Sequence, residues 1–165
     1  MNSRRPASRE AALDAVYASL PAIECRGLCH DSCGPIQMTS VERRRIEATG
    51  MDIRVAGFDP DPKHRMRCSA LTMLDRCAVY EIRPAICRLW GLTRAMQCSY
   101  GCIPEGGYMS SRDGYLFLAR VAEVCGEPKQ AERYRRVAEL DDLENKVFEI
   151  RRESHLHVDV RRSRR

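Results

Sequence analysis

The chain has 165 residues, of which 44% are hydrophobic and 31% charged, and its formal net charge is +5. A chain of this length buries a hydrophobic core without disulfide or metal staples, so we expect a single domain over residues 1–165. No apolar run approaches the roughly 18 residues that cross a bilayer, and the N-terminal stretch lacks the continuous apolar segment of a secretory signal. These features argue against a membrane protein or an exported protein and predict a cytoplasmic location.

The first predicted elements are two helices. Apolar residues recur at helical spacing from Ala11 to Leu20, which predicts a helix that ends there, before a proline. The stretch MTSVERRRIEATG predicts a short helix with Thr39 as its N-cap and Glu42 as the capping-box partner. Gly50 is the residue type that commonly follows a helix, so we expect this helix to end at that point.

The middle of the chain predicts a loop followed by a small β-hairpin. Residues 51–67, which contain GFDPDPKH, have the composition of a loop. Two short segments that favour β-structure, 68–72 and 77–82, flank a turn near residues 74–76.

The remainder of the chain again predicts helices. RPAICRLWG begins a helix at Pro84, where the missing N–H does no harm, and the turn-rich loop CSYGCIPEGGY follows. Two helices are expected over about 111–125, ended by a glycine, and over 128–153. Residues 154–165 form a basic tail, either an edge strand or a disordered end.

Nine cysteines need an explanation, and eight of them lie within residues 25–102. A disulfide scaffold normally belongs to a short exported chain with an even number of cysteines, whereas cytosolic thiols stay reduced. Free cysteines also pack as small hydrophobic residues, so core packing remains an alternative. Several of these cysteines are flanked by charges and glycine rather than by apolar residues, and we therefore favour metal ligation.

The spacing of the cysteines bears on the kind of metal centre. The sequence contains no C-x(2)-C pair, which structural zinc sites most often use, but it has C-x(3)-C at 25/29, 29/33 and 98/102. Such looser spacing favours an iron–sulfur cluster, with a 4Fe-4S cluster as the first choice and Zn²⁺ as the alternative. The count allows one four-cysteine site with spare thiols or two four-cysteine sites.

Arginines accompany many of these cysteines in the sequence. Arginines 26, 67, 76 and 88 adjoin a cysteine, and arginines 83 and 94 lie four residues from one. A cation near a thiol lowers its pKa and favours the thiolate that binds metal. The alternative is that these arginines are solvated surface residues.

Several motifs together resemble the YkgJ-type cysteine-cluster family of zinc- or iron-chelating domains. They are CRGLCHDSC, MTSVERRRI, CSAL, RCAVYE, RPAICR and QCSYGC, in this order over residues 25–102. The resemblance implies metal chelation, and matching the motifs position by position gives the candidate ligands Cys25, Cys29, Cys33, Cys68, Cys77, Cys87 and Cys98.

One position departs from the family pattern. The pattern has an adjacent cysteine pair that would fall at positions 32 and 33, but position 32 is Ser32. We expect Cys102 to replace the lost ligand and restore eight. Cys125 lies in the apolar stretch YLFLARVAEVC, so we expect it in the core rather than at the metal. His30, beside the first cysteines, is the one histidine that could join them, although a surface position is its commoner use.

The predicted fold is mainly α with a small β-hairpin and a cysteine-rich irregular core organised around metal. Within it, residues 25–102 form the metal-binding core and residues 111–153 the C-terminal helices. The predicted function is metal binding through cysteines, with a structural or a redox- or metal-sensing role. No catalytic residues are predicted, because neither a nucleophile triad nor a phosphate-binding loop is recognisable. The alternative is a zinc-stabilised accessory or enzyme domain, related to protein modification or electron transfer.

The C-terminal part of the chain offers two possible contacts with other molecules. The long C-terminal helix carries apolar residues at three- and four-residue spacing, which favour packing on the domain or, alternatively, on a protein partner. These residues are Tyr134, Val137, Leu140, Leu143, Val147 and Ile150. The terminal RRSRR is either a solubilising end or a contact to a polyanion such as nucleic acid.

Overall fold

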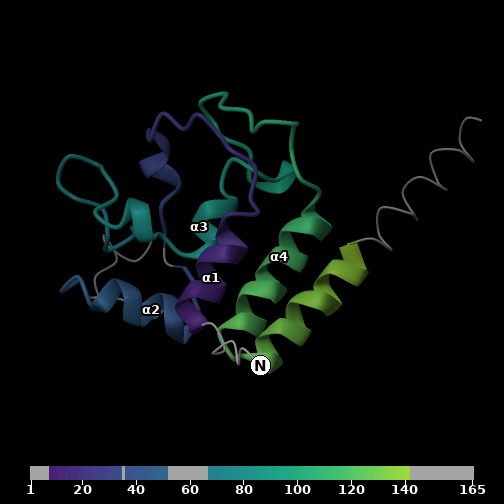
Figure 1. The fold of residues 1–165 in the computed structure, drawn as a ribbon. Coiled ribbons are helices and arrows are strands. Elements are labelled where there is room, and N and C mark those ends of the chain that lie inside the picture. The colour runs from purple at the N-terminus through teal and green to yellow at the C-terminus, as the bar shows by residue number, and fades with distance from the viewer. Residues whose placement is uncertain (1–7, 35, 52–66, 142–165) are drawn as a thin grey trace, which may run out of the picture.

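The computed structural model of the chain describes residues 8–34, 36–51 and 67–141. These residues contain five α-helical segments, of which the first four are α1 (Arg9–Tyr17), α2 (Ser40–Glu47), α3 (Ala85–Leu89) and α4 (Ser111–Val124). The fifth is helical over residues 128–141 and runs beside α4 (Figure 1). Three short 3-10 turns, η1 (Cys29–Ser32), η2 (Tyr80–Ile82) and η3 (Arg94–Met96), lie in the connections. The predicted mainly helical fold is therefore confirmed.

Polar side chains begin the longer helices. The hydroxyl of Ser8 accepts a hydrogen bond from the backbone N–H of Ala11 at the start of α1, and Ser110 does the same at the start of α4. The predicted capping box of α2 is present in full, because Thr39 accepts from the N–H of Glu42 and the Glu42 carboxylate accepts from the N–H of Thr39. These side chains satisfy N–H groups that have no partner inside the helix.

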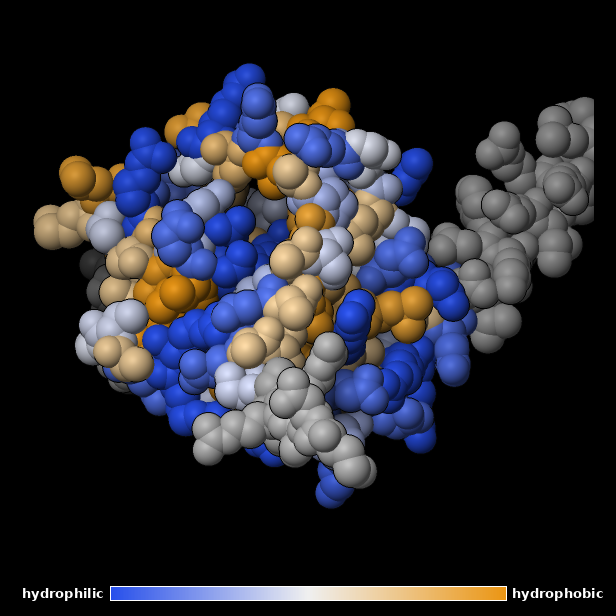
Figure 2. All heavy atoms as spheres, viewed as in Figure 1, coloured by the Kyte–Doolittle hydropathy of each residue, from blue (hydrophilic) through white to orange (hydrophobic). Residues whose placement is uncertain are grey.

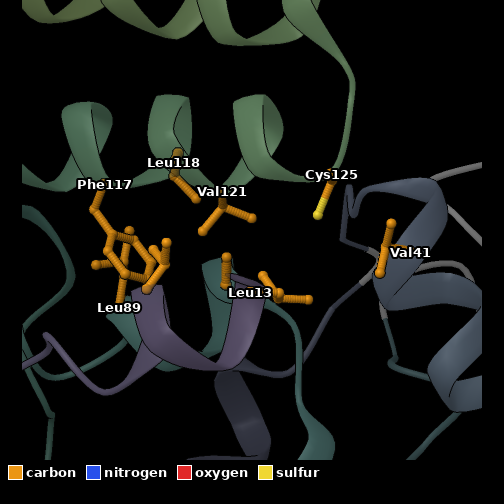
Figure 3. Packing of buried hydrophobic residues seen from close by; sticks show 9 residues of the cluster. Leu13, Val41, Leu89, Phe117, Leu118, Val121 and Cys125 are labelled. Atoms are coloured by element: carbon orange, nitrogen blue, oxygen red, sulfur yellow. The ribbon is translucent and has the colours of Figure 1, made fainter. Parts of the chain in front are cut away.

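The main core is apolar and lies between α1, α3 and α4. Both α1 and α3 pack against α4, and Figure 3 shows Leu13 of α1 and Leu89 of α3 facing Val121 of α4. The expected cysteine-rich core is not confirmed, since Cys125 is the one cysteine in this cluster. The physical reason is that the apolar faces of three helices bury one another without needing the cysteine segments. Cys125 is 1% exposed, in agreement with its predicted place in the core.

The predicted β-hairpin is wrong. Among the described residues, the segment 68–82 forms a single isolated antiparallel bridge, between Leu71 and Cys77, and no strand. The hydroxyl of Thr72 accepts hydrogen bonds from the N–H groups of residues 74 and 76, and Asp75 has a φ of 56°. These side-chain bonds hold a tight turn. The backbone pairs beside this turn, from the N–H of Thr72 to the carbonyl of Arg76 and from the N–H of Ala78 to the carbonyl of Ala70, but η2 takes up the last residues of the expected second strand.

Other predictions fall outside the described residues. They are most of the loop predicted for 51–67, the part of the last helix beyond residue 141, and the basic tail. Within the described part of that helix, Ala131 and Ala138 are buried and Tyr134 packs against the main core, whereas Leu140 is 59% exposed. None of the helices in the described ranges is both long and apolar enough to span a membrane.

Candidate metal centre

All eight cysteines predicted as ligands line one cavity of about 540 Å³. Its walls are irregular segments on both sides of α2 in the sequence, together with α3. In Figure 2, hydrophobic residues show between hydrophilic ones on the left of the molecule, the side on which Figure 1 places the loops next to α2. Seven of the eight cysteines are partly or fully shielded from solvent, and Cys25 is exposed.

Backbone contacts place two segments that carry four of these cysteines side by side, and we call Cys25, Cys29, Cys98 and Cys102 the first cysteine group. The segment after α1 and the segment before α4 lie side by side in Figure 1. Ile23 and Pro104 form an isolated antiparallel bridge, and the N–H of Glu105 donates to the carbonyl of Ala22 at 2.9 Å. This register places the chain leading into Cys25 beside the chain leaving Cys102.

The other four form the second cysteine group, Cys33, Cys68, Cys77 and Cys87. The N–H of Cys68 donates to the carbonyl of Cys33 at 3.0 Å, and the Leu71–Cys77 bridge joins the next part of the chain to them. Cys87 comes from α3. The closely spaced triplet at 25, 29 and 33 is thus divided between the two groups, with η1 as the turn that separates Cys29 from Cys33.

The electrostatics of Cys29 and Cys87 follow the same division, whereas Cys33 is also affected by Cys29 of the first group. Burial raises the pKa of Cys29, and the charges of the other three members of the first group raise it further. Burial, followed by the charges of the other three members of the second group, raises the pKa of Cys87 to about 12. Burial, followed by the charges of Cys29, Cys68 and Cys77, raises the pKa of Cys33 to about 11. Without a cation in the cavity, these thiols stay protonated at neutral pH.

The expected lowering of the thiol pKa by arginines is wrong for Cys77 and Cys87. Arg83 does act to lower the pKa of Cys77 and of Cys87, but burial outweighs it and both pKa values are raised. Arg67 instead pairs with Asp75 at 2.6 Å, and Arg88 lies over the ring of Tyr17 at 4.1 Å.

Cys98 is the exception. Burial acts to raise its pKa, but hydrogen bonds from the N–H groups of Cys102 and Tyr100, a hydrogen bond with the Cys102 side chain and the charge of Arg26 outweigh burial and lower the pKa. Cys98 therefore ionises more readily than an ordinary thiol.

The donor set fits a zinc ion or an iron–sulfur cluster in its chemistry. Within the described residues, no three Cys, His, Asp or Glu side chains are close enough to hold a metal ion as they stand. Each group nevertheless supplies four thiols, which is the number that a structural zinc ion or a cubane cluster takes. A buried donor on the cavity wall, Nε1 of Trp90, also has no acceptor in the described part of the chain.

Three residues that the sequence singled out line the cavity. Cys102 is 7% exposed and lines the cavity, as does Ser32 at the position of the lost ligand. His30 also lines the cavity, and its Nε2 lies 3.1 Å from Asp31 Oδ1. The ligand role of Cys102 and a contribution from His30 stay predictions.

The sequence interpretation missed two aromatic residues in the cavity wall. Tyr80 lies so close to Cys25 that burial and a hydrogen bond to that thiol raise the pKa of the phenol. Trp90 follows Cys87 by three residues, a spacing that puts two side chains on one side of a helix. This spacing within RPAICRLW is a signal that could have identified Trp90, whereas nothing in the local sequence connects Tyr80 to Cys25.

Comparison with known proteins agrees with the donor set. No curated protein and no solved structure matches the chain. The sequence pattern of one domain family matches residues 24–125, well over half of the chain, and so reaches beyond the cysteine motifs to the end of α4. The chain thus belongs to the CxxCxxCC family, which is described as a "Putative zinc- or iron-chelating domain".

Proposed function

We propose that the protein binds metal through all eight cysteines, arranged as two four-thiol sites. The observation that carries this proposal is the single cavity that all eight line. The backbone register and the mutual effects on thiol pKa values support the division into the first and the second cysteine group. In this arrangement Cys102 completes the first group, and no ligand is required at position 32.

The metal that we favour is iron in a 4Fe-4S cluster, with one zinc ion in each group as the alternative. The three-residue gaps between cysteines and a cavity of about 540 Å³ support a cluster, because a cubane accepts thiolates from looser loops. The mainly thiolate donor set suits both metals. The proposed role is either to hold the loop segments in place or to respond to redox state or metal supply.

The distinguishing experiment is metal analysis of the full chain purified without oxygen. Iron with an equal amount of acid-labile sulfide and a visible absorption band identifies a cluster, whereas colourless protein with two zinc ions per chain identifies the alternative. Protein that holds neither metal, and whose cavity segments keep their hydrogen-exchange protection in a strong chelator, would overturn the proposal.

Substitutions test the division into two sites. We expect C102S and C87S each to remove about half of the bound metal, since each breaks one four-thiol site. C125A is the matched control, because Cys125 lies in the main core and does not line the cavity. Full metal content in C102S would show that Cys102 is not a ligand, and complete loss in either variant would show a single shared centre.

A further inference from the structure

Trp90 is the single tryptophan of the chain, and its indole N–H is buried on the wall of the cysteine cavity. Among the described residues it has no hydrogen-bond acceptor. An indole N–H is a donor only, and a buried donor without an acceptor is unfavourable and rare in proteins. The indole N–H is thus available to an acceptor that occupies the cavity.

The position of Trp90 relates it to both cysteine groups. It caps the C-terminal end of α3, three residues after Cys87 of the second group. The following residue, Gly91, approaches the first group, since a Cβ atom built there would lie 3.7 Å from Cβ of Cys98. Gly91 has a φ of 85°, so the chain turns sharply immediately after the indole.

A second orphaned group shows what is particular about Trp90. The hydroxyl of Thr93 is also buried without a partner in the described residues, but Thr93 does not line the cavity. Its Cγ2 methyl instead contacts α4, 3.0 Å from where a Cβ on Gly114 would lie. Thr93 therefore serves as an internal comparison, a buried polar atom without a partner in the described residues that lies outside the cysteine cavity.

We propose that the indole N–H of Trp90 donates a hydrogen bond to an anionic sulfur of the bound metal centre, either a cysteine thiolate or a cluster sulfide. This inference rests on the proposed function. Thiolate and sulfide accept hydrogen bonds far better than a protonated thiol, because they carry negative charge. The N–H therefore stabilises the metal-bound form selectively, and in a redox-active cluster it raises the reduction potential.

The single indole gives a direct test in the full chain. In ¹⁵N-labelled zinc-loaded protein there is one indole N–H resonance, and we expect it to shift downfield and to exchange more slowly than in chelator-stripped protein. In W90F we expect zinc affinity, measured by chelator competition, to fall about 10- to 100-fold, the usual effect of removing an outer-shell partner of a metal ligand. If the centre is a cluster, its midpoint potential falls in the same variant.

T93V is the matched control, because it removes the other orphaned polar atom and should leave metal affinity and the indole resonance unchanged. If wild-type protein binds metal fully while its indole resonance does not respond, the inference is wrong and the proposed function stands. If W90F and T93V bind zinc with equal affinity, the inference is likewise wrong and the proposed function stands. A wild-type chain that binds no metal overturns the proposed function and the inference with it. The resonance measurement needs no variant and decides the matter even where W90F does not fold.

Discussion

Replacing Glu42 with glutamine perturbs a buried carboxylate that joins three helices. The side chain is 2% exposed. Its Oε1 accepts hydrogen bonds from the hydroxyl of Tyr17 and from the N–H of Ala85, and its Oε2 accepts from the N–H and the hydroxyl of Thr39. In either orientation of a glutamine amide, the NH₂ group therefore faces a backbone N–H. One donor then points at another, and at least one buried N–H loses its acceptor.

The magnitude follows from these contacts. A hydrogen bond to a charged group contributes about 1.5–3 kcal/mol, and a buried group left without a partner costs about 1–3 kcal/mol. We expect E42Q to lower the free energy of unfolding by about 3–5 kcal/mol, a large share of the roughly 5–15 kcal/mol that stabilises a typical domain. When the amide NH₂ takes the place of Oε1, the lost acceptor is the one that holds the first N–H of α3; because α3 carries Cys87, we then expect faster release of metal from the second cysteine group.

The assay is urea unfolding of the metal-loaded chain, followed by far-ultraviolet circular dichroism, with metal release monitored by a chromogenic chelator. E47Q is the matched control, since Glu47 lies at the exposed end of the same helix and should change stability by less than about 0.5 kcal/mol. If E42Q is as stable as E47Q, the carboxylate does not connect the helices and the reasoning is refuted.

Three further outcomes are expected. First, the pKa values of Cys33 and Cys87 are raised to about 11 and about 12, so each thiol must release its proton when metal binds at neutral pH. The apparent metal affinity should therefore rise with pH, about tenfold per pH unit for each proton released. An affinity that does not change between pH 6 and 8 would contradict this. Second, removing metal with a chelator should leave helical circular dichroism from the apolar core while the cavity segments lose hydrogen-exchange protection, and protection unchanged in those segments would show that metal does not order them. Third, G126A should lower the free energy of unfolding by about 1–2 kcal/mol, measured by thermal unfolding, because Gly126 has a φ of 81°. G106A is the control, since Gly106 has a φ of 75° and open space around it, and it should lower the free energy by the same amount because the group that crowds Gly126 is the flexible end of Arg9. A much larger loss for G126A would mean that Arg9 cannot move.

Features fixed by neighbouring residues were predictable from the sequence. The capping box of Thr39 and Glu42 depends on residues three apart, and it forms as predicted. The hairpin failed because local hydrogen bonds compete with strand pairing: the backbone pairs Thr72 with Arg76 and Ala78 with Ala70, but residues 80–82 then form the 3-10 turn η2. Alternation of residue types cannot show this competition, since it does not say which local hydrogen bond is stronger.

The grouping of the cysteines was not predictable. The bridge between Ile23 and Pro104 and the hydrogen bond between Cys33 and Cys68 join segments far apart in the chain, and no local pattern encodes them. Sequence also cannot reveal burial, which is why adjacent arginines suggested lowered thiol pKa values where burial raises them. Spacing and resemblance could predict the set of eight candidate cysteines, but not which of them belong to the same group.

The role of Glu42 explains why two separate motifs of the sequence belong to one site. MTSVERRRI supplies the carboxylate and RPAICR supplies the N–H of Ala85 that it binds at 2.6 Å, so the capped helix directly fixes the start of α3. Cys87 is the one predicted ligand that lies on an α-helix, whereas the other seven lie in irregular segments or 3-10 turns. Ordering such segments costs conformational entropy, which metal binding offsets. One thiol is thus held in place by the helical scaffold before metal arrives, and the loops that carry the others are expected to close around it.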